Sequence, residues 1–217
     1  MKRILLILGL LLVLVSSAGA AEILTKQSGD DDLNTDGSAL DVQLAAPEAT
    51  YSAAVAAAYT PAATPTDIFT ITGSASRVVE VRKVWLSTTQ TTAGQNAWFI
   101  VKRSSANSGG TSQAVTAVAH DSLSQTATAT VLRYAASNPT LGTEVGKLWS
   151  GHVTSPAPAT AEADGYTGTV IDLCELFGKP VTLRGTGQVL AISFEGAALP
   201  AGLSVLFGCT WSERALE

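Results

Sequence analysis

The sequence predicts an all-β protein, an antiparallel β-sandwich of jelly-roll or Greek-key type. Ala and Thr are the most frequent residues and Ser, Gly and Val are common after the leader, whereas charged residues make up 14% and aromatic residues 6% of the 217 residues. This composition is typical of short strands joined by many turns rather than of helical bundles. In addition, nine or ten short apolar segments follow one another at a spacing of roughly 10 to 15 residues, separated by turn-forming residues.

Residues 1–20 form the first element and resemble a secretory leader. Two basic residues precede an unbroken apolar run from Ile4 to Val15, and small residues follow it. This pattern predicts a signal peptide that is cleaved before Ala21. The alternative is an uncleaved apolar arm held in a membrane, because apolar and small residues continue to Leu24 and approach the length of a span. The body is expected outside the cytoplasm, in the periplasm or the medium.

Two further segments precede the sandwich. Residues 21–50 contain seven acidic residues and one lysine and have no apolar period, so they are expected to form an acidic, flexible linker. Residues 51–65 form an Ala/Pro-rich arm, for which a short helix and an extended chain both stay open. Alanine favours a helix and the two prolines end it. The β-sandwich domain is expected to occupy residues 66–217.

Alternation of apolar and polar residues predicts the strands. The apolar residues of the second strand change phase between Val81 and Val84, which predicts a bulge near Arg82 and Lys83. The last strand alternates most strictly, from Leu203 to Trp211. The expected strands are residues 67–72, 77–87, 97–101, a short one around 115–118, 127–134, 145–153, 180–184, 188–195 and 203–213.

The sequence leaves three features of these elements undecided. Residues 169–177 space their apolar side chains as a helix does, yet their β-branched content favours a strand. Gly73 and Gly185 each follow a strand and are interpreted as hairpin turns. Cys174 and Cys209 could form a disulfide outside the cytoplasm or serve as ordinary thiols, with Cys209 in the core.

Asp32, Asn34 and Asp36 are the candidate metal ligands, because they match the first half of a calcium loop. The position of the bidentate glutamate in such a loop is held by Gln43, whose neutral amide cannot replace it. Tight binding is therefore not expected, and the alternatives are weak binding of extracellular calcium or a plain acidic linker. Two Cys and two His without close spacing do not form a zinc site.

No catalytic residues are assigned, and we expect a protein that is not an enzyme. His120 and Asp121 are adjacent, so on an extended chain they point to opposite faces and cannot orient one another beside Ser112 or Ser122. A Gly-x-Ser-x-Gly elbow is absent from the sequence. Carboxylates for glycoside cleavage would have to come from Asp172, Glu175, Glu195 and Glu213, whose separation the sequence does not define.

Charge and tryptophan placement narrow the classes of partner. Residues 51–217 contain eleven acidic and ten basic residues without a basic stripe, which argues against nucleic acid as a ligand. Trp211 shares a face with core residues and is expected in the core. Trp85 and Trp98 lie in strands with some apolar character on both sides, which suits a subunit interface or a ligand-binding face. Trp149 is a further candidate for such a face, as a ring that could stack on sugars.

Seven segments of the body form a distinctive series: ATPTDIFTITGSAS at 63–76, TQTTAG at 89–94, VKRSSANSGGTS at 101–112, ATATV at 127–131, ASNPTLG at 136–142, VTLRGT at 181–186 and WSE at 211–213. In their order and spacing these segments resemble a group of small proteins encoded by tailed phages and prophages. The resemblance covers about residues 50–213 and implies a virion structural protein, such as a capsid decoration or accessory β-sandwich subunit, without catalytic residues or cofactors.

The leader and the acidic linker depart from this pattern, because a virion subunit assembled in the cytoplasm needs neither. The leading hypothesis is a homo-oligomeric virion subunit that contacts other virion proteins. The alternative is an exported binding module directed at carbohydrate or at cell-surface proteins, with its tryptophans and loops as the binding groups. A membrane contact is expected only if the leader stays uncleaved.

Overall fold

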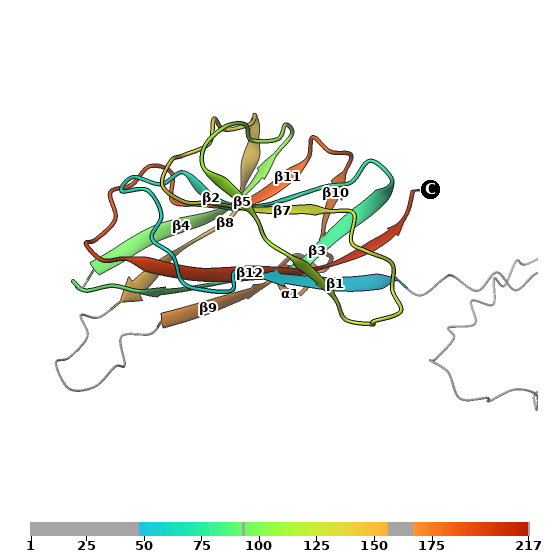
Figure 1. Cartoon of the computed structure of the whole chain (residues 1–217), viewed down its shortest axis with the longest axis horizontal. Coiled ribbons are helices and arrows are strands. Elements are labelled where there is room, and N and C mark those ends of the chain that lie inside the picture. The colour runs from blue at the N-terminus through green and yellow to red at the C-terminus, as the bar shows by residue number, and fades with distance from the viewer. Residues whose placement is uncertain (1–47, 93, 156–166, 217) are drawn as a thin grey trace, which may run out of the picture. The chain divides into compact units, whose positions relative to one another are not determined.

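The computed structural model describes residues 48–92, 94–155 and 167–216. Its strands form two antiparallel six-stranded sheets packed as a β-sandwich, which confirms the predicted fold class (Figure 1). Sheet A contains β1 (Ala49–Ala54), β3 (Arg77–Thr89), β6 (Ala117–Ala119), β9 (Thr167–Asp172), β10 (Val181–Arg184) and β12 (Ser204–Ala215). Sheet B contains β2 (Asp67–Thr72), β4 (Gly94–Arg103), β5 (Ser112–Ala114), β7 (Thr130–Tyr134), β8 (Glu144–Ser155) and β11 (Val189–Ser193).

The strand order brings distant parts of the chain together. Sheet A runs β10-β3-β12-β1-β6, with β9 pairing the same edge of β3 as β10 does. Sheet B runs β5-β7-β2-β11-β4-β8. Consecutive strands of the described chain never pair with each other. Most connections lead to the other sheet, and β9 and β10 follow one another along the same edge of β3.

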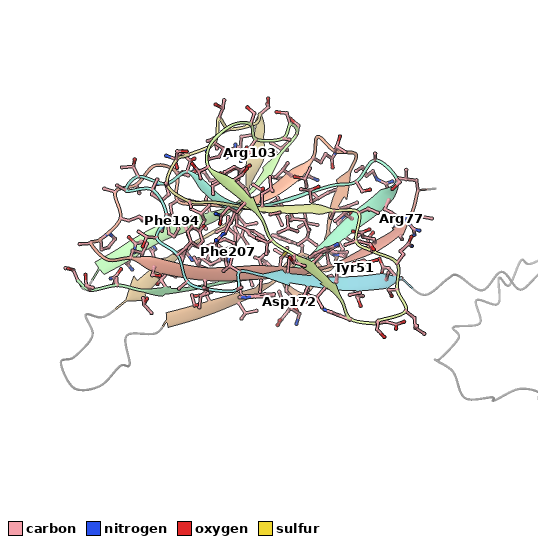
Figure 2. The ribbon with its side chains drawn as sticks, in the orientation of Figure 1. Tyr51, Arg77, Arg103, Asp172, Phe194 and Phe207 are labelled. Carbon is pink, nitrogen blue, oxygen red and sulfur yellow. The ribbon has the colours of Figure 1, made fainter. Side chains whose placement is uncertain are left out.

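The core lies between the sheets and is rich in aromatic rings. Phe207 of β12 packs edge-on against Phe69 of β2, with ring centroids 4.6 Å apart. Trp211 stacks on Tyr51 of β1 at 5.6 Å, and all four side chains are at most 1% exposed. Figure 2 shows Phe207 between the sheets. Burial of each such side chain contributes about 1.5 to 3 kcal/mol.

The sandwich begins earlier than the sequence indicates, because β1 falls across the expected linker and arm. All six residues of β1 pair with β12, from Ala49 opposite Glu213 to Ala54 opposite Gly208. Tyr51 and Ala53 point inward and are 1% exposed. Alanine-rich strands lack the β-branched signature, so the partner strand decides the structure of this segment.

The bulge expected near Arg82 is present. Lys83 pairs with Thr210 of β12 and Val81 pairs with the next residue, Trp211, so Arg82 is the additional residue on β3. The bulge lets Val79, Val81, Val84 and Leu86 all face the core despite their change of phase.

Residues 169–177 contain both a strand and a helix. β9 ends at Asp172, whose carboxylate caps α1 (Leu173–Phe177) by accepting hydrogen bonds from the backbone N–H groups of Cys174 and Glu175. Gly178 ends the helix with φ 70°, a left-handed conformation that favours glycine. Both cysteines are free thiols, Cys209 in the core and Cys174 in α1.

Gly73 and Gly185 do not form hairpins but lie side by side where the chain passes from one sheet to the other. Gly73 leads from β2 in sheet B to β3 in sheet A, and Gly185 leads from β10 in sheet A to β11 in sheet B. A Cβ atom on Gly73 would lie 2.5 Å from the carbonyl oxygen of Gly185. The two similar sequences are therefore two crossovers in contact, and glycine permits this contact.

Candidate functional site

The outer surface of sheet B is covered by the chain's own loops. Residues 104–111 and 135–143 lie against each other, with Ser108 and Thr140 bridged and a Cβ atom on Gly142 only 1.8 Å from the oxygen of Ser105. Consequently the outward side chains of β4 and β11 near their centres are buried, including Val101, Val189 and Ala191 at 0 to 1% exposure.

A buried ion pair holds these loops on the sheet. Arg103 donates from Nε and Nη2 to the two carboxylate oxygens of Asp67 at 2.7 and 2.8 Å, and the two side chains are 3% and 0% exposed. Asn107 donates to Asp67 at 2.8 Å and accepts from the N–H of Gly142 at 2.9 Å. Figure 2 shows Arg103 beneath these loops. The cluster joins β2, β4 and both loops, and it was not predicted because no short spacing links its members.

The outer surface of sheet A is partly exposed: Val118 and Val170 are exposed, whereas Ser87 is 5% exposed. Alternation along each strand places one set of side chains in the core and the other set on this surface. We call it the outer face of sheet A, and its central side chains are Ser52 and Ala54 of β1, Lys83, Trp85 and Ser87 of β3, Val118 of β6, Gly168 and Val170 of β9, and Leu206, Gly208 and Thr210 of β12.

Trp85 lies at the centre of the outer face of sheet A. It is opposite Gly208 on one side and Val170 on the other. A Cβ atom on Gly208 would lie 2.3 Å from Cζ2 of the indole, so the ring lies across the glycine. Trp85 is half-buried by this arrangement, and glycine at position 208 keeps the surface flat there.

Trp98 and Trp149 lie elsewhere. Trp98 is fully buried on the inner side of β4, and its ring contacts that of Trp149 with centroids 4.4 Å apart and planes tilted by 51°. The buried indole nitrogen of Trp98 has no conventional hydrogen-bond partner. The aromatic ring of Trp149 lies next to this indole. Trp149 is half-buried and folds over Gly151. The rings of Trp98 and Trp149 pack against each other. Of the three tryptophans, only Trp85 lies on the outer face of sheet A.

Ion pairs within the chain neutralise the charges on β3 and β12 at this surface. Lys83 pairs with Asp172 at 2.8 Å, Arg82 with Glu48 at 2.6 Å and Arg214 with Glu80 at 3.1 Å. The hydrogen bond from Lys83 lowers the pKa of Asp172, and the same bond raises the pKa of Lys83. The half-buried centre of the face consequently carries hydroxyl, glycine and apolar groups.

The residues considered for catalysis lie apart from one another or already make structural contacts within the chain. His120 and Asp121 lie in the exposed segment after β6, and Asp121 accepts from the N–H of Leu123 at 2.9 Å. Glu195 pairs with Lys147 at 2.7 Å. Glu213 is 2% exposed and accepts from the backbone N–H groups of Thr128 and Ala129 at 2.9 Å, as well as from the indole of Trp211 at 3.0 Å. Asp172 pairs with Lys83, so three of the four candidate carboxylates make structural contacts.

The candidate calcium ligands Asp32, Asn34 and Asp36 lie outside the described residues. In the described part of the chain, no group of three or more His, Cys, Asp or Glu side chains is placed to hold a metal ion. Among the same residues, no helix is long and apolar enough to cross a membrane.

Two shallow hollows of about 260 and 240 Å³ are lined by different parts of the segment after β1. The first lies between residues 60–63 and 199–203, and the second between residues 54–57 and 114–116 with Arg133. Their walls are mainly alanine, proline, valine and leucine side chains, without a converging set of polar groups.

The chain matches no protein-family model, no curated protein and no solved structure. The outer face of sheet A therefore has to be interpreted from its own geometry.

Proposed function

We propose that this protein is a non-enzymatic structural subunit that assembles with other protein chains through the outer face of sheet A. The observation that carries this proposal is the difference between the two sheets. Loops cover the centre of sheet B, whereas on sheet A Val118 and Val170 are 59% and 66% exposed on either side of the half-buried Trp85 and Leu206. A surface that presents apolar side chains across several strands is typical of a protein interface.

The setting proposed for this assembly is a phage-type virion, with the chain as a capsid decoration or accessory subunit. The sequence resemblance over about residues 50–213 supports this choice, and a compact β-sandwich suits such a role. If the leader is used instead, the same assembly would take place in the periplasm or the medium.

Mass spectrometry of purified particles tests the virion proposal. Particles are prepared by density gradient from a culture that expresses the gene, and the chain is quantified in the particle fraction and in the soluble fraction. Enrichment with the major capsid protein is the expected result. Absence from particles while the soluble fraction contains the chain would reject the virion setting.

A second candidate function is an exported module that binds neutral carbohydrate, and Trp85 supports it. An indole laid flat on a sheet, with hydroxyl groups of Ser52 and Thr210 in the adjacent row, can stack on a sugar ring and accept or donate hydrogen bonds around it. A glycan array with the wild type and with Trp85→Ala and Trp149→Ala tests this function. Binding lost in Trp85→Ala and kept in Trp149→Ala would support it, and signal at background would remove it.

A further inference from the structure

We propose that the outer face of sheet A binds the same face of a second copy of this chain, so that two sandwiches pack sheet against sheet about a twofold axis. This inference rests on the proposed function, because it takes assembly as the role of this face. It goes further by naming the partner as an identical chain. An isologous contact of this kind requires a surface that is complementary to itself in charge and shape.

The charges of the outer face meet this requirement. Along β3 from Glu80 to Thr89 and along β12 from Ser204 to Arg214, the outward charged side chains are Glu80, Arg82, Lys83 and Arg214, and each is paired within the chain. Across β3 and β12, two copies therefore meet without uncompensated like charges, which would otherwise oppose the association of a surface with itself. The exposed Arg184 lies on β10, outside the face.

The apolar side chains are distributed in a way that suits a sheet better than a small ligand. Val118 lies on β6, Leu206 on β12, Trp85 on β3 and Val170 on β9, so the apolar surface crosses five adjacent strands. Four strand spacings correspond to about 19 Å. The indole covers only the middle of this width, and the exposed valines at both edges would stay solvated if a single sugar ring occupied the centre.

The strands alone provide less area than a typical interface. Ser204 to Ser212 spans about 27 Å along β12 and five strands span about 24 Å, so about 650 Å² is an upper limit, because β1, β6 and β9 are shorter than β12. Specific interfaces bury about 800 Å² on each partner. At the β9 edge, Leu176 and Phe177 of α1 are 50% and 38% exposed and add apolar surface next to the face.

Sedimentation velocity of the full chain tests the proposal, with two valines as a matched pair. Val170 on β9 is 66% exposed and lies on the outer face of sheet A, whereas Val145 on β8 is 63% exposed and lies on sheet B. We expect a wild-type dimer, and we expect Val170→Lys and Trp85→Lys to raise the dimer dissociation constant at least tenfold. Val145→Lys is expected to dimerise as the wild type does.

The thermal transition of each variant shows whether it is folded, and Val170→Lys keeps the test valid if Trp85→Lys unfolds. A wild type that stays monomeric up to about 100 µM would overturn the inference, as would a Val145→Lys variant that dissociates like Val170→Lys. A monomer that binds a neutral glycan through Trp85 would overturn it in favour of the second candidate function. Incorporation into particles is a separate measurement, so a monomer found in virions rejects this inference alone.

Discussion

Arg103 shows how one buried residue organises a surface. Its guanidinium is charged at 3% exposure, which is costly without compensation. Burial alone would lower the pKa of Arg103, but the hydrogen bonds and charge of Asp67 more than offset this, and the pKa is raised. The remaining donor group, Nη1, reaches the carbonyl oxygen of Gly142 at 3.1 Å. The ion pair thereby fixes the loops that close sheet B.

We predict that Arg103→Met lowers the free energy of unfolding by about 3 to 5 kcal/mol, because it leaves the carboxylate of Asp67 buried without its partner. Urea unfolding followed by tryptophan fluorescence measures this change. The exposed Arg184 provides the control, and Arg184→Met is expected to stay within about 0.5 kcal/mol of the wild type. The double variant Asp67→Leu/Arg103→Met should recover part of the loss. An Arg103→Met variant as stable as the wild type would contradict the structural role.

Asp172 gives a pH-dependent prediction. Its pKa is lowered from 3.8 by the hydrogen bond from Lys83, so the folded state binds the proton less tightly than the unfolded chain does. The stabilisation is complete above the unfolded pKa and is lost as pH falls through the lowered folded pKa. For Lys83, whose pKa is raised from 10.5, the stabilisation is complete below that value and is lost at higher pH.

Asp172→Asn should therefore lower the Tm by a constant amount between about pH 5 and pH 9. The difference from the wild type should shrink in stronger acid and in stronger base. Asparagine caps helices as well as aspartate does, so the variant removes the charge and keeps the cap of α1. Differential scanning calorimetry across this range makes the measurement, and a difference independent of pH in strong acid would refute the assignment.

At the scale of elements, β3 and β12 depend on the contact between Trp85 and Gly208. We predict that Gly208→Ala destabilises the protein by about 1 to 3 kcal/mol, since the new methyl group would overlap the indole and the oxygen of Ala53. In the double variant Trp85→Ala/Gly208→Ala, the overlap with the ring disappears, and the combined loss should be smaller than the sum of the two.

The control for this prediction is Gly146→Ala on β8. A Cβ atom at Gly146 would meet nothing within 4 Å, so the variant should unfold at the same denaturant concentration as the wild type, or at a slightly higher one. Equal losses for Gly208→Ala and Gly146→Ala would show that glycine is not required beneath the indole.

The elements differ in how far the sequence determines them. β12 could be predicted because its apolar residues alternate strictly, and the bulge on β3 because a shift in phase has one simple explanation. β1 could not, because Ala53 is apolar but small and its strand exists through pairing with β12. The connection at Gly73 could not be distinguished from a hairpin, since glycine permits both and only the distant Gly185 decides between them.

At the scale of the whole molecule, the two thiols report on its cooperative unfolding. Cys209 is fully buried in the core, and burial raises the pKa of its thiol, which makes it unreactive. Cys174 is partly exposed in α1. We predict that one thiol per chain reacts with a disulfide reagent in the native protein and that the second reacts only through global unfolding.

Mass spectrometry of the labelled chain identifies the cysteine that reacts, and Cys174→Ser should abolish the fast phase. Rapid reaction of both thiols in the native protein would show that the core opens locally. No reactive thiol in the native or the unfolded chain would indicate a disulfide, contrary to the free thiols of the structure.

The candidate surface could be predicted only in part. Trp85 and Trp98 have similar local sequences, with apolar neighbours on both sides, and the sequence does not distinguish them. Their difference arises at the scale of the whole molecule, because Trp98 faces the core between the two sheets, whereas Trp85 lies half-buried on the outer face of sheet A. Which ring faces the core thus depends on contacts between residues far apart in the chain.

The position of β12 has a consequence for how the chain is made. β12 is the last of the described strands, yet it lies between β1 and β3. It pairs with β3 along its whole length and with β1 from Gly208 to Glu213. A nascent chain that does not yet include residues 204–215 therefore lacks the strand that joins β1 and β3. Sheet A can form completely only after this strand has left the ribosome, which makes its assembly dependent on contacts between residues far apart in the chain.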